Sequence, residues 1–402
     1  GPNDRPVANC SQDQYGARLG GPIIKDKLFF FVSGELNTKE QPTGTSADGN
    51  APIQFNNPAG AAALSSLLIS RYDPGGLADF PVATDSDLAF VRLDWNASAA
   101  TQVTLRHNFV DAGRDVVSER STATRFRFPT AIYTQANETN ATVAQVNSVF
   151  GANAFNEARV GFQTVRDARS TPVIFPSIEI GGTGPRNGEF IAGTEQFSTA
   201  NTLDQDVLEI TDDFTWLRGA HTFTFGTHNE IFEFKNLFLS SAYGYYYFPT
   251  FAAFQAGQAT NYQITFANGA DPRRPTQFKV AQYGIYAGDQ WRFNDRLSLT
   301  FGLRIDKPDF ADTPSFNPVV QNTLGVSTAS VASDDPVISP RFGFNWDPTG
   351  DGKQQLRGGL GIFSGRTPYV WISNAYGNTG IETTSLTCTG TCVPPPFSAD
   401  PF

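Results

Sequence analysis

Residues 88–109, LAFVRLDWNASAATQVTLRHNF, decide the fold class of this chain. In the first half, apolar side chains occupy every second position up to Trp95, with an arginine and an aspartate between them. The alternation resumes at Val103 after the small and polar residues 96–100, which suit a turn. Because successive side chains of a strand point to opposite faces, the stretch predicts two antiparallel strands joined as a hairpin.

The same unit of strand, short turn and strand recurs along the chain. Its further copies are 15–24 with 28–34, 143–150 with 155–165, 206–216 with 221–234, 278–293 with 297–306, and 338–346 with 356–363. Together with the first they predict six hairpins, hence about twelve strands.

The connections between the hairpins are far longer than the turns within them. We expect them at residues 36–85, 111–137, 170–203, 240–277 and 308–337, and they carry most of the prolines. Structureless loops of this length are uncommon in compact soluble domains, whereas bacterial outer-membrane barrels combine short periplasmic turns with long extracellular loops. The asymmetry predicts an all-β fold, a transmembrane antiparallel β-barrel domain over residues 1–402 with these five segments as extracellular loops.

Large aromatic residues close the strands that lead into the short turns. They are Trp95, Phe150, Trp216, Trp291 and Trp346. Aromatic belts form at membrane interfaces because the ring prefers the acyl boundary while the indole N–H prefers water. We therefore predict a membrane-interface girdle at the turn side of the barrel. The alternative is that these residues anchor strand ends in a soluble β-domain, which alternation alone does not exclude.

Composition narrows the classes of protein further. The formal net charge of −10 argues against a nucleic-acid partner, which needs clustered basic residues. No apolar run approaches the roughly 18 residues of a membrane-spanning helix. The sequence contains no methionine, even at position 1, so we expect a processed or internal segment of a longer protein.

Three motifs resemble the barrel of TonB-dependent receptors of the Oar-like group. They are GGPIIKDKLFFF at residues 20–31, QYGIYAGDQWRFNDRLSLTFGLRID at 282–306 and SPRFGFNWDPTGDGKQQLRGGLGIFSGR at 339–366. Such receptors enclose a plug in a barrel of about 22 strands and import bulky nutrients with energy relayed by TonB. The resemblance implies that the chain is the first part of such a barrel, with the plug and the TonB box upstream.

The resemblance also implies the partners and the location of the chain. These are the lipid of the bacterial outer membrane, the TonB complex acting through the plug, and a bulky ligand such as an oligosaccharide, a peptide or a siderophore. Two other functions stay open: a structural or adhesive outer-membrane protein that uses its long loops, and a passive diffusion pore. The sequence offers no catalytic constellation and no cofactor motif, so we expect no enzyme, no cofactor and no resident metal. His228 and Glu230 lie two positions apart and so share a strand face, where they could begin a metal site. We favour the alternative that they are two polar residues facing the lumen.

Two local features are candidate sites. The first is a cluster of aromatic residues that could stack on sugar rings or on the apolar face of a ligand: Tyr243, Tyr245, Tyr246, Tyr247 and Phe248. Its alternative is that these rings extend an aromatic girdle or pack the loop onto its neighbours. The second is the pair Cys388 and Cys392, which could form a disulfide in an oxidising compartment or remain two free thiols.

Overall fold

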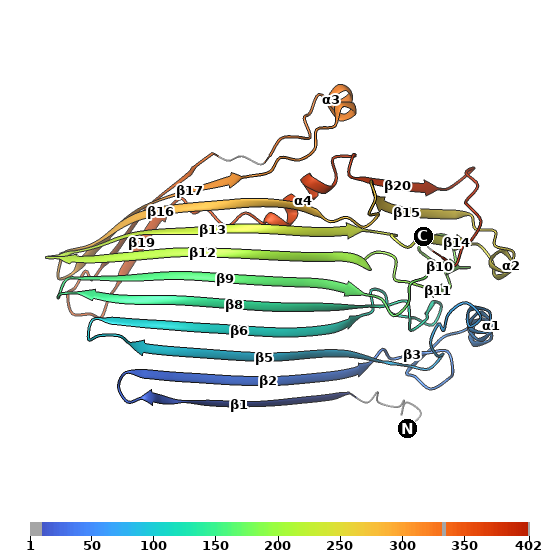
Figure 1. Cartoon of the computed structure of the whole chain (residues 1–402), viewed down its shortest axis with the longest axis horizontal. Helices are drawn as coiled ribbons and strands as arrows, with labels where there is room; N and C mark the ends of the chain where they lie inside the picture. Colours follow the sequence, from blue (N-terminus) through green and yellow to red (C-terminus); the bar gives the residue numbers. More distant parts are fainter. Residues whose placement is uncertain (1–9, 332–334, 401–402) are drawn as a thin grey trace.

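The computed structural model describes residues 10–331 and 335–400. Its largest element is an antiparallel sheet of twelve strands (Figure 1). The strands lie side by side in the same order in which they follow one another along the chain. The strands are β1 Ser11–Ile24, β2 Leu28–Pro42, β5 Pro81–Asn96, β6 Thr101–Val116, β8 Tyr133–Phe150, β9 Ala154–Ser170, β12 Ala200–Arg218, β13 His221–Leu239, β16 Thr276–Asn294, β17 Leu297–Phe310, β18 Val337–Trp346 and β19 Leu356–Gly361. All six predicted hairpins and the number of strands are confirmed.

The short turns lie together at one end of the sheet, on the left in Figure 1. In the first of them the N–H of Lys27 donates to the carbonyl of Ile24 at 3.0 Å, and Asp26 adopts a positive φ of 63°. Aspartate tolerates this left-handed conformation better than most residues. Glycine, which adopts it without strain, takes the corresponding role at Gly151 and Gly219. The turn residues thus allow the abrupt reversals that the strand pattern predicts.

The register places apolar side chains on one face of the sheet and polar ones on the other. On β17, Leu303 lies opposite Ala287 and Pro340, while its neighbour Arg304 lies on the other face opposite Tyr286. We call these the apolar face and the polar face. The apolar face exposes large side chains on most of its strands: Leu19, Val91, Leu105, Val160, Ile210, Phe225, Ile285, Leu303, Ile338 and Leu360. Apolar surfaces of this extent are rare on soluble monomers.

Polar side chains interrupt the apolar face in several places, for example at His107 and Thr142. In another, Asp212 on β12 lies opposite Ala158 and Thr227, in a row whose other members from Val103 to Ile338 are apolar. The amide of Asn156 donates to its carboxylate at 2.7 Å, and a second hydrogen bond of 2.8 Å joins Asn229 to Thr227. The polar groups therefore satisfy one another locally, which lowers the cost of placing them on an apolar surface.

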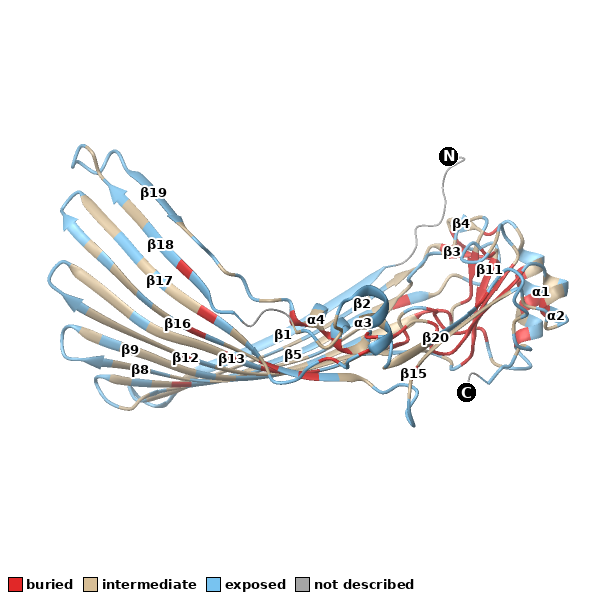
Figure 2. Cartoon of the chain, turned by 90° about the horizontal axis from the view of Figure 1, so that it is seen from above, coloured by how far each residue is buried: buried red, intermediate tan, exposed pale blue. Residues whose placement is uncertain are grey.

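The sheet is curved, with β1 and β19 as its two edges (Figure 2). Helix α4, Tyr369–Gly377, lies on its concave side and packs on the polar face, where Tyr369 and Tyr376 join a buried cluster with Phe232, Phe234, Phe278 and Val280. The polar face is therefore the inner one. Among the described residues, no helix is long and apolar enough to cross a membrane.

The strands extend beyond the predicted limits, so the predicted connections 36–85, 111–137, 170–203, 240–277 and 308–337 each include the outer ends of strands. For example, β2 continues to Pro42 and β5 begins at Pro81. The apolar alternation fails there because both faces become polar, as at Asp85 and Ser86 on β5. Hydrophobic periodicity therefore could not show where the strands end.

The connections are also folded, where the sequence suggested structureless loops. Six short strands, from three of the connections and from the segment after β19, form a second sheet in the order β20-β15-β14-β10-β11-β7. We call it the outer sheet. Their bounds are β7 Phe126–Arg127, β10 Ser177–Ile180, β11 Phe190–Ala192, β14 Tyr245–Phe248, β15 Asn261–Ala267 and β20 Thr383–Cys388. The remaining elements are β3 Thr45–Ser46, β4 Ile53–Gln54, α1 Pro58–Leu68, α2 Phe251–Gln255 and α3 Pro318–Leu324.

The largest apolar core lies beside the outer sheet, at the end away from the short turns (Figure 2). Helix α1 begins after Asn57, whose side chain accepts from the N–H of Gly60 at 3.0 Å, and it buries Leu64 and Leu68 completely. The core joins segments that are distant in sequence: Phe55, Phe126, Phe128, Phe175, Ile178, Phe190, Phe248 and Phe254. Burial of these side chains, at about 1.5–3 kcal/mol each, holds the connections together.

Buried ion pairs reinforce this outer region. Glu179 on β10 is 5% exposed and accepts from Arg125 at 3.0 Å, from the N–H of Gly188 at 3.2 Å and from the hydroxyl of Tyr245 at 3.3 Å. The second carboxylate partner of Arg125 is Glu119, at 2.7 Å. Glu119 is half-exposed, so it is solvated as well as paired.

We predict that Glu179→Ala destabilises the outer region by about 3–5 kcal/mol, because it leaves Arg125 without its buried partner. Glu233→Ala is the control: it removes the carboxylate of an exposed pair with Lys279 on the main sheet, and it should leave the protection of the outer region unchanged. Limited proteolysis at increasing urea, followed by mass spectrometry of the fragments, would measure both. Equal protection of residues 117–199 in the two variants would contradict the role assigned to Glu179.

Candidate functional site: the polar face of the sheet

The polar face carries a connected group of charged side chains at its centre. The hydroxyl of Tyr286 on β16 donates to Asp213 on β12, and the guanidinium of Arg304 lies 5.3 Å from the centre of the Tyr286 ring. Arg304 in turn pairs with Asp306 at 2.7 Å. Alternation along β12, β16 and β17 brings these residues to one face.

A glycine makes room for this arrangement. A Cβ atom at Gly226 would lie 2.4 Å from the ring of Tyr286, so the ring lies across β13 directly over that position. Any larger residue would displace the tyrosine hydroxyl from Asp213. Gly226 therefore positions Tyr286, and the requirement is one of space, since no unusual backbone angle is involved.

A second group lies next to it on the same face. The hydroxyl of Thr211 and Nδ1 of His228 are 3.0 Å apart, and Glu209 and Glu230 lie 3.9 Å and 3.8 Å from the two ring nitrogens. Arg159 on β9 approaches Glu209 at 3.7 Å. His228 and Glu230 thus share a face, as predicted. Through these contacts the pair belongs to the polar network. The described residues contain no cluster of three potential metal ligands.

The segment that follows β19 crosses the polar face and is tied to three of its strands. The hydroxyl of Ser364 donates to Asp306 at 2.9 Å, Arg366 lies 3.6 Å from Glu230, and the hydroxyl of Tyr369 donates to Gln282 at 2.9 Å. We call residues 362–377 the inner segment. It carries no period-2 pattern, which is why sequence reasoning missed it, whereas Asp213, Tyr286 and Arg304 were recoverable from strand parity.

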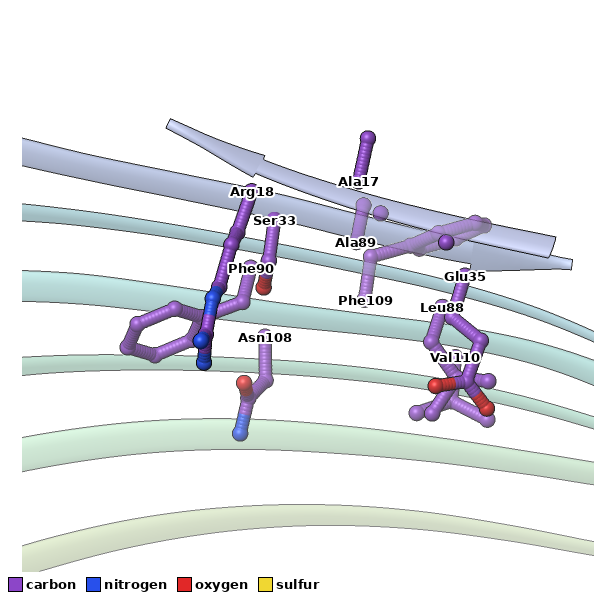
Figure 3. Close-up of a pocket in the computed structure, with 12 residues that line it drawn as sticks. Ala17, Arg18, Ser33, Glu35, Leu88, Ala89, Phe90, Asn108, Phe109 and Val110 are labelled. Atoms are coloured by element: carbon purple, nitrogen blue, oxygen red, sulfur yellow. The ribbon is translucent and has the colours of Figure 1, made fainter. Parts of the chain in front are cut away.

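Further along the concave side, β1, β2, β5 and β6 line an open groove (Figure 3). The side chains of Arg18, Phe90 and Asn108 extend to the same side of the sheet, and Ala17 points to the other. Glu35 lies one row away and accepts from Gln14 at 2.8 Å. The groove offers a guanidinium, a carboxylate, an amide and a ring. With the central groups, it makes a surface of charged and hydrogen-bonding side chains on the concave side of the sheet.

The predicted aromatic site lies elsewhere, at the outer sheet. Tyr245, Tyr246, Tyr247 and Phe248 form β14, which lies between β10 and β15, and these residues and Tyr243 are at most 7% exposed. Burial raises the pKa of Tyr245, and the carboxylate of Glu179 adds to the effect. Packing of the loop, the alternative kept open above, is the arrangement observed. A ligand contact by these rings stays a prediction.

The geometry of the main sheet is matched by comparisons with known proteins. A family model described as an outer membrane beta barrel domain matches residues 2–74 and 57–402. The chain belongs to this family. Its place is therefore the bacterial outer membrane, and the apolar face of the barrel domain is the one that meets lipid.

Solved structures similar to the barrel domain include two from Gram-negative bacteria. The outer membrane transporter YddB from Escherichia coli is 16% identical, with a TM-score of 0.59 over 94% of this chain and 41% of that one. The siderophore receptor PirA from Acinetobacter baumannii is 14% identical, with a TM-score of 0.49 over 89% and 41%. The chain thus spans about two fifths of the length of these proteins. No curated protein matches the sequence.

The aromatic residues predicted as a girdle lie at the turn ends of strands of the barrel domain. Trp95 and Trp346 are 46% and 42% exposed on the apolar face, and Phe150 is 57% exposed. Trp216 contacts Phe223, and Trp291 stacks on His221 at 5.3 Å. On β5 the apolar row runs from Trp95 to Ala89 and ends before Asp87. A membrane-interface girdle at the five aromatic positions stays a prediction.

Cys388 and Cys392 form a disulfide in the structure, and Cys10 is an exposed free thiol. The disulfide closes a loop at the end of β20 in the outer sheet. An oxidising environment outside the cytoplasm is compatible with such a bond.

We predict that Leu303→Lys destabilises the folded barrel domain in phospholipid vesicles by about 2–4 kcal/mol, because it turns an ammonium toward lipid. Thr300→Lys, on the polar face of the same strand, is the control and should change stability little. Guanidinium-dependent unfolding followed by tryptophan fluorescence measures the difference. Equal losses in the two variants would argue against the assignment of the faces.

We also predict that residues 1–402 of protein isolated from outer membranes contain one reactive thiol, Cys10, before reduction and three after it. Unfolding in the presence of an alkylating reagent, followed by peptide mass spectrometry, would give the count for each cysteine. Alkylation of Cys388 or Cys392 without prior reduction would show that the disulfide is not formed.

Proposed function

We propose that this chain is the barrel portion of a TonB-dependent outer-membrane receptor that takes up a bulky nutrient, and that it belongs to the Oar-like group. The observation that carries the proposal is that the sheet has two different faces. Its apolar face is directed outward, and its inner face carries ionised side chains that are paired with one another. Charges at that depth are tolerated where they line a wet interior. The three motifs at 20–31, 282–306 and 339–366 support the subgroup.

The open edges of the sheet support a larger barrel. In hydrocarbon every backbone N–H and C=O group needs a partner, so the outer rows of β1 and β19 require further strands or another protein element. A barrel of about 22 strands, with a plug that contacts the TonB complex, would supply both the closure and the energy coupling. The five connections and the outer sheet would then lie outside the cell, above the membrane.

The proposed ligand is an oligosaccharide, a peptide or a siderophore. The polar face has cations and anions in alternation, together with exposed amide and hydroxyl groups, which suits hydrogen-bonding solutes of these kinds. A structural or adhesive protein that uses its outer region, and a passive pore, are the competing functions.

The function can be tested by deleting the gene in its own bacterium and measuring growth on single ferric siderophores, oligopeptides and oligosaccharides. We expect the deletion to lose growth on one class, the intact gene to restore it, and a TonB deletion to cause the same loss. Restored growth in the absence of TonB would favour a passive pore. Normal growth on every class, with loss of surface attachment, would favour the adhesive function.

A further inference from the structure

The apolar face has a narrow groove at the turn end of its first strands. Its lining is almost entirely apolar: Ile24, Leu28, Leu93, Trp95, Val103 and Leu105, with Lys27 at the rim. Register explains the groove, because Leu28 lies opposite both Ile24 and Trp95, and Trp95 lies opposite Val103. The groove therefore crosses four adjacent strands at the level of the aromatic girdle.

Two lysines stand where the groove meets the turns. Lys25 and Lys27 flank Asp26 in the turn between β1 and β2. Two hydrogen bonds from Asn96 fix this turn onto β5. The backbone N–H of Asn96 donates to the carbonyl of Lys27 at 2.8 Å, and its side-chain amide donates to the carbonyl of Asp26 at 3.1 Å. Within the part of the chain that the structure describes, neither lysine ammonium is paired with a carboxylate.

Lys27 also borders a second, polar hollow between the turns. Its lining includes the two lysines, the single carboxylate of Asp26, and Asn96, Ser98 and Gln102. An apolar slot and a polar hollow thus meet at one cation, at the level where hydrocarbon gives way to lipid headgroups. A ligand that fits both has a long alkyl chain and an anionic, hydrogen-bonding head.

We propose that this groove is a binding site for one anionic phospholipid of the leaflet at the turn end. An acyl chain lies against Leu93, Trp95 and Leu105, and the phosphate is held by Lys27 and Lys25. Two observations single out phospholipid among amphiphiles: the groove is continuous with the lipid-facing surface, and its lysines oppose the sign of the phosphate. The site is independent of the nutrient that the barrel takes up.

Another turn provides a matched comparison. Lys353 is also an exposed turn lysine, at the β18–β19 hairpin, but Asp351 lies 3.4 Å from it. Within the described residues, Lys353 does not line any of the five principal hollows of the surface, the apolar groove included. Lys353→Gln therefore removes the same kind of charge at the same end of the barrel without touching the proposed site.

The test uses the complete outer-membrane protein in nanodiscs of phosphatidylcholine with a minor fraction of phosphatidylglycerol that carries a photoactivatable acyl chain. After irradiation, peptide mass spectrometry locates the label. We expect it to concentrate on residues 24–28 and 93–105, and to fall about fivefold in Lys27→Gln, since one lysine near an anionic lipid contributes about 1 kcal/mol. Lys353→Gln should leave the labelling unchanged.

A second variant tests the slot apart from the charge. Val103→Phe fills the groove from a lipid-facing position and should reduce the label while leaving Lys25 and Lys27 in place. Label spread evenly over the lipid-facing strands, or equal label in the native protein and in Lys27→Gln, would overturn the proposal. A photoactivatable phosphatidylcholine that labels the groove as strongly as phosphatidylglycerol would also overturn it, because the lysines would then select nothing.

Discussion

The fold depends on one constraint: a strand that crosses hydrocarbon must give every backbone N–H and C=O group a partner on a neighbouring strand. Antiparallel hairpins with short turns meet it with the least chain, because each strand pairs with the one just completed. This explains why the sheet order follows the chain from β1 to β19 without a crossover. It also explains why the connections at the other end are free to be long, since outside hydrocarbon their backbone groups can pair with water or, as in the outer sheet, with one another.

The same constraint explains what the sequence could predict. Pairing of adjacent strands leaves a local signal, an alternation of apolar and polar residues that breaks at a turn, so the six hairpins and the faces of Leu303 and Arg304 were predictable. The outer sheet leaves no such signal. Its strand β10 pairs in parallel with β14, and the paired residues Ser177 and Tyr245 are 68 positions apart in the sequence. Both strands are buried. Short buried strands of this kind cannot be recognised by periodicity.

The candidate site was predictable only in part, for the same reason. Strand parity assigns Asp213, Tyr286 and Arg304 to the inner face, but it says nothing of the inner segment that reaches Asp306 through Ser364. The sequence left two interpretations of the aromatic run at residues 243–248 open, a ligand surface and packing of the loop. In the structure, residues 245–248 form β14 inside the outer sheet and are buried. A loop rich in aromatic residues carries enough apolar area to form a core of its own.

The inner segment bears on the choice between a transporter and a passive pore. It is held to the polar face by hydrogen bonds and also by rings, since Tyr369 and Tyr376 pack on Phe232, Phe234 and Phe278. Lifting it into a water-filled lumen would expose these buried rings, at about 1.5–3 kcal/mol for each large side chain. A passive pore does not need a segment held across its polar face at this cost. The contact therefore favours the proposed receptor, which would have imported energy at its disposal, over a passive pore.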